Sequence, residues 1–186
     1  MITASQLRVA QNDPEAFIRG VLHGDPWEKQ VEIARSVQQH HRTAVRSCHG
    51  IGKTKVAAWI ALWFLYCFAN SKVITTAPTW HQVKNLLWRE IRGEHEKFEY
   101  FLGGKCNTDS LDLGSEWFAI GLSTNQPERF QGFHAENILL IVDEASGVSQ
   151  EIFDAAEGFM TSANARMLLI GNPTKVEGEF YQAFRS

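Results

Sequence analysis

The chain has 186 residues, of which 44% are hydrophobic and 21% charged, and its formal net charge is −3. This length fits one domain with a sizeable core, and the composition excludes a disordered chain. The acidic balance does not indicate a nucleic-acid binder, although a local basic patch on such a domain can still contact phosphates. The three cysteines form no CxxC pair, so neither a disulfide framework nor a zinc site is predicted, and we expect a reducing, cytosolic setting.

Apolar strand patterns alternate with helical patterns along the chain, which predicts a three-layer α/β fold with a mainly parallel sheet. Residues 1–24 look helical but loosely patterned, and they carry no secretory signal. The other expected elements are a helix opened by Asp25-Pro26 and ending at Gln39, a strand at Thr43–Cys48, a helix from Gly52 to Ala69, a strand at Lys72–Ala77, a helix from Trp80 to Arg92, a hairpin of Asn107–Leu113 and Glu116–Leu122, a strand at Asn137–Val142, a helix at Gln150–Thr161 and a strand at Arg166–Ile170.

One apolar stretch, Val56–Ala69, resembles a membrane span by composition alone. It is shorter than the roughly 20 residues that a transmembrane helix needs. It also begins just after Thr54, where the helix of a phosphate-binding loop would start. We therefore expect a helix buried beneath the sheet and no membrane partner.

The segment before this helix is a variant phosphate-binding loop, with the sequence SCHGIGKT at Ser47–Thr54. The usual pattern is GxxxxGK[ST], so a serine replaces the first glycine. The glycines let backbone N–H groups close around a phosphate at the positive end of the following helix. Lys53 is expected to reach the β- and γ-phosphates of ATP, and the Thr54 hydroxyl to ligate Mg²⁺. The predicted nucleotide-binding positions in the loop are Ser47, Cys48, His49, Gly50, Ile51, Gly52, Lys53 and Thr54.

A second motif is the apolar strand ILLIVDE, which ends in two carboxylates. A buried strand delivers Asp143 to the carboxyl edge of the sheet, beside the loop, where Mg²⁺ needs an anionic ligand. Glu144 follows at a position from which it can take a proton from an attacking water. The alternative reading, a solvated turn, is disfavoured because the phosphate-binding loop is present upstream.

Three further residues have weaker signals. Asn172, in the segment IGNPT after the last strand, can contact the γ-phosphate or the lytic water, or it can simply turn the chain. Trp27 and Gln30 suit adenine, by stacking and by paired hydrogen bonds, although a tryptophan on a helix is often only part of the core. Lys84, Arg89 and Arg92 lie on one predicted helix and fit either DNA phosphates or a solvated face.

Taken in order, DPWEKQ, SCHGIGKT, TTAPTWHQVKNLLWREI, PERFQGFHAENILLIVDEAS and IGNPT resemble the ATPase domain of a tailed-phage terminase large subunit. The resemblance covers roughly residues 25–184. It implies an additional-strand, conserved-glutamate (ASCE, RecA-like) P-loop ATPase that drives double-stranded DNA through the portal protein into a procapsid. By position, it makes Gln30 the adenine-sensing residue, Asp143 the Mg²⁺ ligand, Glu144 the catalytic acid and Asn172 part of the coupling motif.

The resemblance also implies a homo-oligomeric ring, a pentamer in the family, with Arg129 offered to the ATP of a neighbouring subunit. The alternative for Arg129 is a solvated loop charge. His49 stands where the family often has arginine, and an imidazole is a weaker phosphate ligand near neutral pH. Further implied partners are the terminase small subunit and a procapsid, on which the protein docks transiently in the host cytoplasm without entering the mature virion.

The chain ends soon after the coupling motif, and no second acidic cluster is evident. We therefore expect an N-terminal helical segment at 1–24, an ATPase domain at 25–186, no nuclease domain and no DNA cleavage. Whether the chain includes the last strand and lid of the ATPase stays open. Two rival functions stay open. One is a nucleotide-dependent DNA-binding or assembly subunit that does not hydrolyse ATP, and the other is a helicase-like translocase lobe.

Overall fold

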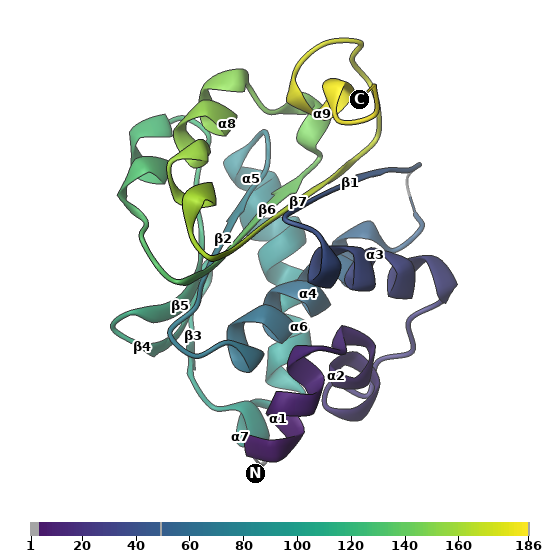
Figure 1. Ribbon diagram of the computed structural model, residues 1–186, viewed down its shortest axis with the longest axis vertical. Helices are drawn as coiled ribbons and strands as arrows, with labels where there is room; N and C mark the ends of the chain where they lie inside the picture. The colour runs from purple at the N-terminus through teal and green to yellow at the C-terminus, as the bar shows by residue number, and fades with distance from the viewer. Residues whose placement is uncertain (1–3, 49, 186) are drawn as a thin grey trace.

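A seven-stranded sheet separates two layers of helices in the computed structural model, which describes residues 4–48 and 50–185 (Figure 1). The strand order is β1-β7-β6-β2-β5-β4-β3. The first five strands in this order run parallel, and the hairpin β4–β5 and the short β3 are antiparallel. The predicted three-layer α/β fold is therefore confirmed. The strands are β1 (Arg42–Arg46), β2 (Lys72–Thr76), β3 (Lys105–Cys106), β4 (Ser110–Gly114), β5 (Trp117–Gly121), β6 (Asn137–Asp143) and β7 (Asn164–Gly171).

The position of β7 decides which loops meet. Although β7 comes last in the sequence, it pairs with β1 on one side and with β6 on the other. It therefore lies between the strand that precedes the phosphate-binding loop and the strand that carries the two acids. This is the additional strand that the resemblance implied, and it brings three loops to one edge of the sheet.

One helical layer is organised around α4 (Lys53–Cys67), the predicted apolar helix. All of its residues from Val56 to Cys67 are buried, which confirms that the helix is part of the core. No helix in residues 4–48 and 50–185 is long and apolar enough to span a membrane. Around α4 lie α1 (Ala4–Gln11), α2 (Pro14–Gly20), α3 (Glu28–Gln39), α6 (Trp88–Glu96) and α7 (Glu99–Leu102).

The opposite face of the sheet is covered by a thinner layer. It contains α8 (Gln150–Glu157), the short α9 (Glu179–Gln182) and the 3₁₀ turns Pro127–Gly132 and Phe159–Thr161. Their apolar side chains pack on Ile138, Leu140 and Val142 of β6. Figure 1 shows α8 and α9 on the far side of the sheet from α1 and α2.

Several predicted boundaries are wrong. The helix expected from Asp25-Pro26 begins at Glu28, because Arg19 binds both the Asp25 carboxylate and the Pro26 carbonyl and holds this dipeptide outside the helix. The strand expected to reach Cys48 ends at Arg46. The helix expected at Gln150–Thr161 ends at Glu157, and β7 extends the strand expected at Arg166–Ile170 at both ends.

The helix expected from Trp80 to Arg92 is interrupted. It consists of α5 (Trp80–Gln82), a π-helical turn at Val83–Leu87 and α6, which continues to Glu96. Wider turns of this kind insert a residue and change the face that the following residues present. Here the buried Trp88 follows the turn, and its indole N–H donates to Thr75 Oγ1 of β2 over 2.8 Å.

An ion-pair network around the buried carboxylate of Glu94 links α4 to α6. Lys55, directly after Thr54, donates to Glu94 over 2.6 Å and to Glu90 over 2.7 Å. Glu94 is 2% exposed and also accepts hydrogen bonds from Lys97 and from the Trp59 indole N–H. Burial raises the pKa of Glu94, but the hydrogen bonds from these donors outweigh burial and lower the pKa below its usual value. The network fixes the first turn of the phosphate-loop helix against α6.

Glu94→Gln is expected to lower the free energy of unfolding by about 2 kcal/mol, because the change removes the charge that two lysines face in a buried site. Urea unfolding near neutral pH measures the difference. Glu96→Gln, on the same helix but exposed, is the matched control and should change stability by less than about 0.5 kcal/mol. Equal stability of the Glu94 variant and the wild type would contradict this role.

Candidate nucleotide site

Three loops converge at the carboxyl edge of the sheet. Arg46 of β1 is paired with Gly171 of β7, and Asp143 of β6 is paired with Ile170. Beyond these pairs, the Ser47 N–H donates to the Gly171 carbonyl over 3.0 Å. The sheet register thus brings the start of the phosphate-binding loop, the two acids and the segment at Asn172 to the same place, where α/β proteins bind ligands.

The phosphate-binding loop turns through two glycines with left-handed backbones, Gly50 (φ 79°) and Gly52 (φ 82°). Gly52 is also the N-cap of α4. The free N–H groups and the positive end of the helix dipole at this terminus favour an anion. Of the other loop positions, Cys48 is exposed, Ile51 is half-buried, and His49 lies outside the described residues.

Lys53 points toward the acids. Its side chain is 6% exposed, and Nζ lies 3.0 Å from the Cys48 carbonyl and 3.6 Å from Oε1 of Glu144. The ammonium group is therefore held between the loop backbone and the acid. A cation in this position can contact phosphate oxygens that enter the loop.

Thr54 and Asp143 face each other across the site. The Thr54 hydroxyl donates to Oδ2 of Asp143 over 3.4 Å, and Oδ1 accepts the Glu144 N–H over 3.0 Å. Asp143 is 3% exposed. Burial, and next the charge of Glu144, raise the pKa of Asp143 from 3.8 to about 6. A nearby cation would reverse this effect, because it favours the ionised carboxylate.

A hydroxyl and a carboxylate are hard oxygen ligands of the kind that Mg²⁺ prefers. A divalent cation beside Asp143 would also offset the unfavourable burial of this carboxylate and its repulsion by Glu144. Among the described residues no group of three or more His, Cys, Asp or Glu side chains could hold a metal by itself. The Thr54 hydroxyl and the Asp143 carboxylate are chemically suited to hold a Mg²⁺ whose other ligands would be phosphate oxygens or water.

Glu144 has a strained backbone, with φ 48° and ψ 45°. Such left-handed non-glycine residues cost free energy and are kept only where the surroundings impose them. The surroundings here include Gly171, since a Cβ at that position would lie 3.2 Å from the Glu144 Cα and carbonyl carbon. The carboxylate lies between Lys53 and the Asn172 N–H, which donates to Oε2 over 3.4 Å. The acid is thereby held at the mouth of the loop.

Asn172 is half-buried, and it is its backbone amide that contacts Glu144. Its carbonyl accepts the Thr174 N–H over 2.9 Å, which tightens the segment after β7. The structure therefore brings Asn172 to the site, next to the acid.

Gln30 is buried and has both ends of its amide engaged. Its Oε1 accepts the Trp27 N–H over 3.2 Å, and its Nε2 donates to the Gly52 carbonyl over 3.1 Å. Gly52 has a φ of 82°, which favours glycine, and a Cβ there would lie 2.7 Å from Gln30 Nε2, so a larger residue would displace the Gln30 amide. Gln30 thus supports the phosphate-binding loop, a contact that sequence reasoning missed.

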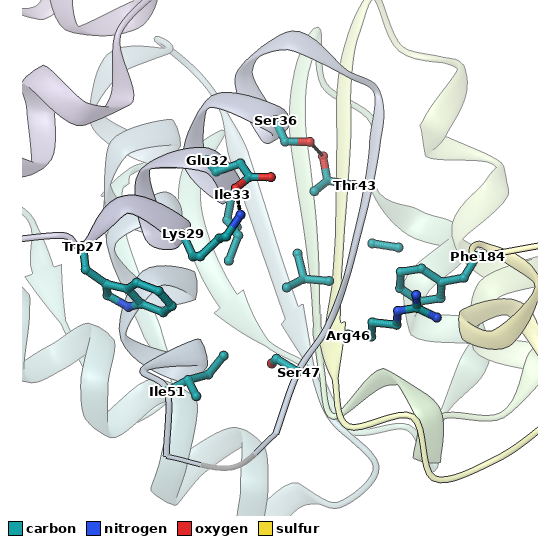
Figure 2. A pocket seen from close by; sticks show the side chains of 12 residues that line it. Trp27, Lys29, Glu32, Ile33, Ser36, Thr43, Arg46, Ser47, Ile51 and Phe184 are labelled. Carbon is teal, nitrogen blue, oxygen red and sulfur yellow. Dashed lines mark hydrogen bonds and ion pairs between the residues drawn. The ribbon is translucent and has the colours of Figure 1, made fainter.

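A pocket of about 320 Å³ lies beside the loop, between α3 and the outer edge of β1 (Figure 2). Trp27, 48% exposed, and Ile51 line the side toward α3. Arg46 and Phe184 line the other side, with the Arg46 guanidinium 5.1 Å from the centre of the Phe184 ring. The sequence predicted Trp27 and Ile51 as binding residues but not Arg46 and Phe184, because nothing in the pattern placed residue 184 beside β1.

Two other predicted groups are not brought to this cluster. Arg129, in the turn Pro127–Gly132, is exposed and makes no hydrogen bond or ion pair with the described site residues. Of the possible DNA-contacting residues, Arg89 is exposed and Lys84 is half-buried, whereas the Arg92 guanidinium donates to the Thr108 carbonyl over 2.9 Å.

The chain is 32% identical over 176 residues to a protein of Enterobacteria phage P7 described as "Probable terminase, large subunit". The matched region is 88% of this chain and 35% of that protein, so the chain spans about a third of its relative. No protein-family model matches the chain.

Solved structures agree with this relationship. The large terminase ATPase domain of Thermus phage P74-26 aligns with a TM-score of 0.77 at 20% identity, over 92% of this chain and 74% of that one. The predicted resemblance to a terminase ATPase domain is confirmed. The HK97 bacteriophage large terminase aligns with this terminase-like domain at a TM-score of 0.66 and 16% identity, over 92% of this chain and 38% of that one.

A helicase shares the fold more distantly. The UvsW helicase of bacteriophage T4 aligns with a TM-score of 0.57 at 12% identity, over 86% of this chain and 57% of that one. At such identities the structural likeness concerns the fold alone, so the chemistry of the terminase-like domain has to be argued from its own residues.

Asp143→Asn is expected to make the metal-free protein more stable above about pH 6. Because the folded-state pKa of Asp143 is raised to about 6, wild-type stability falls as the pH rises from about 4 to about 6, and it stays lower above that. The neutral amide escapes this loss, worth about 1–3 kcal/mol.

Urea unfolding without Mg²⁺ at about pH 4 and about pH 7 measures the difference between Asp143→Asn and wild type. Asp154→Asn, an exposed aspartate on α8, serves as the control and should show no such pH dependence. A gap between Asp143→Asn and wild type that is the same at both pH values would contradict the prediction.

Proposed function

We propose that this chain is the ATP-hydrolysing motor domain of a viral terminase large subunit, which drives double-stranded DNA into a procapsid through the portal. The observation that carries the proposal is the convergence of Lys53, Thr54, Asp143 and Glu144 at one edge of the sheet. The terminase large subunit relative and the terminase-like fold support the same reading. The packaging role of the whole protein is inferred from these relationships.

ATP binding is the first step of the proposed reaction. The N–H groups around Gly50 and Gly52 bind the β-phosphate, and Lys53 contacts the β- and γ-phosphates. Thr54 and Asp143 would hold Mg²⁺, which neutralises charge on the phosphate oxygens when it is bound. The adenine ring is assigned to the pocket beside the loop, where it would stack on Trp27 and contact the apolar side chain of Ile51.

Hydrolysis is assigned to Glu144. Its carboxylate accepts a proton from a water whose oxygen attacks the γ-phosphorus. The bond between that phosphorus and the bridging oxygen of the β-phosphate breaks, and ADP and phosphate leave. Lys53, 3.6 Å from the carboxylate, lies where negative charge gathers. The Asn172 segment, which contacts the acid through its backbone, is the proposed coupling element.

Assembly completes the proposed site. The exposed Arg129 is assigned to the ATP of a neighbouring subunit in a homo-oligomeric ring, a pentamer by family resemblance. The portal, the procapsid and the terminase small subunit are the proposed partners, and the host cytoplasm is the proposed place of action. We expect no DNA cleavage by this chain.

The proposed domain boundaries are an ATPase domain at 25–186 and a helical segment at 1–24. The segment is tied to the ATPase core, because the Trp63 indole N–H of α4 donates to the Ala10 carbonyl over 2.8 Å and Phe17 and Ile18 are fully buried. It is therefore proposed to fold together with the ATPase domain rather than as an independent unit.

Two other functions share parts of this account. A helicase-like translocase lobe is favoured only by the distant fold likeness to the UvsW helicase. A binding-only assembly subunit would need the phosphate-binding loop but not a carboxylate held at its mouth. The position of Glu144 between Lys53 and Asn172 favours hydrolysis over the binding-only function. A translocase lobe would use the same carboxylate, so Glu144 does not separate the two motor functions.

Glu144→Gln is expected to lower ATP turnover by at least about 10²-fold, because the amide cannot accept the proton of the attacking water. The nucleotide Kd should change less than about twofold, since the loop and Lys53 are unchanged. Steady-state phosphate release and titration with a fluorescent nucleotide measure the two quantities. Glu151→Gln, an exposed glutamate on α8, is the control. Turnover retained in Glu144→Gln would remove Glu144 as the base.

Arg129→Ala is expected to impair hydrolysis only in the assembled ring, by a factor on the order of 10³ where a neighbour supplies the cation. Turnover per chain is compared in isolated monomers and on procapsids, with the oligomeric state verified by light scattering. Arg8→Ala, an exposed arginine on α1, is the control. An equal loss in a verified monomer would contradict a role in the neighbouring site.

A further inference from the structure

Ser146 lies two residues after the proposed base, in the 3₁₀ turn Ala145–Gly147, and its hydroxyl is fully used. The residue is 8% exposed. Its Oγ lies 3.2 Å from the Thr174 nitrogen, 3.1 Å from the Lys175 nitrogen and 3.0 Å from the Thr174 hydroxyl. A hydroxyl has two lone pairs and one hydrogen. Ser146 Oγ therefore accepts the two backbone N–H groups and shares a further hydrogen bond with the Thr174 hydroxyl, in which either oxygen can be the donor.

These contacts fasten the segment that follows β7. Pro173 and the next residues through Gly178 are exposed, so this loop has little packing to hold it. Its first residues are attached to the turn and to the residue before it, Asn172 to the Glu144 carboxylate and Thr174 and Lys175 to the Ser146 hydroxyl. The position of the loop and the position of the Glu144 carboxylate therefore depend on each other.

The turn itself is rigid. Gly171 lies against the Glu144 backbone, and a Cβ at Gly171 would be 3.0 Å from the Ala145 nitrogen. On its other side, Gly147 approaches Pro78, where an added Cβ would lie 2.6 Å from the proline ring. A turn that is packed on both sides moves little by itself, so a displacement of Glu144 would be passed to the groups hydrogen-bonded to the turn.

We propose that Ser146 is a positioning residue that couples the Glu144 carboxylate to the loop Asn172–Lys175. The inference rests on the proposed ATP hydrolysis and specifies how the same site is regulated. With the hydroxyl present, the loop holds the carboxylate through the Asn172 amide in a geometry suited to the attacking water. When the carboxylate moves during turnover, the loop moves with it.

The test compares Ser146→Ala and Ser146→Thr with wild type in the full chain. Ser146→Ala should lower kcat about tenfold, the equivalent of about 1.4 kcal/mol, and leave the nucleotide Kd within about twofold. Hydrogen exchange at the Lys175 amide should become faster, because its acceptor is gone, whereas the Thr174 amide keeps the Asn172 carbonyl as an acceptor. Ser146→Thr keeps the hydroxyl and should recover most of the turnover. Ser149→Ala, an exposed serine without a capping bond in the same segment, is the matched control.

Faster exchange in Ser146→Ala with a wild-type kcat would overturn the inference, because the hydroxyl would then hold the loop without affecting the acid. A loss of nucleotide affinity as large as the loss of kcat would overturn it too. A wild-type chain without turnover even when assembled on procapsids would instead refute the proposed function. In that case unchanged exchange at the Lys175 amide in Ser146→Ala would refute the link to the loop separately.

Discussion

The nucleotide site depends on the close contact between the end of β7 and the turn that begins at Glu144. Gly171 leaves space for the left-handed backbone of Glu144, and the β7 register places this contact next to the start of the phosphate-binding loop. Because β7 lies between β1 and β6, one strand separates the phosphate-binding loop from the acid along the edge of the sheet. Strain at Glu144 is thus maintained by the strand order, and it directs the carboxylate toward Lys53.

The two acids at the site carry more negative charge than Lys53 neutralises. Asp143 is buried beside a second acid, and Lys53 compensates only part of the charge, so the pKa of Asp143 rises to about 6. In the proposed function, a divalent cation bound at Asp143 would recover the free energy that this burial costs, and Mg²⁺ affinity would then depend on pH in the range where Asp143 ionises. The network of Lys55 and Glu94 holds the first turn of α4 firmly, so the loop has a fixed support on which ligands bind.

Much of this arrangement could be predicted from local sequence patterns. The buried strand before Asp143, the glycines before Lys53 and the apolar helix α4 each follow from periodicity or composition, and the fold class followed from their alternation. What the patterns could not supply were contacts between distant segments. The Gln30 amide on the Gly52 carbonyl, Phe184 beside Arg46 and the Ser146 hydroxyl on the Thr174 segment all join residues far apart in sequence. The π-helical turn at Val83–Leu87 was missed for a related reason, since the burial of Trp88 over β2 decides it.

We propose that the phosphates of ATP and a Mg²⁺ ion bind between the loop Ser47–Thr54 and the acids at the end of β6. A crystal structure of the chain with Mg²⁺ and a non-hydrolysable ATP analogue would show where they bind. We expect the β-phosphate within the loop, Mg²⁺ on the Thr54 hydroxyl close to Asp143, and the γ-phosphate facing Glu144. Phosphates bound elsewhere, or a metal with no ligand among Thr54 and Asp143, would contradict it.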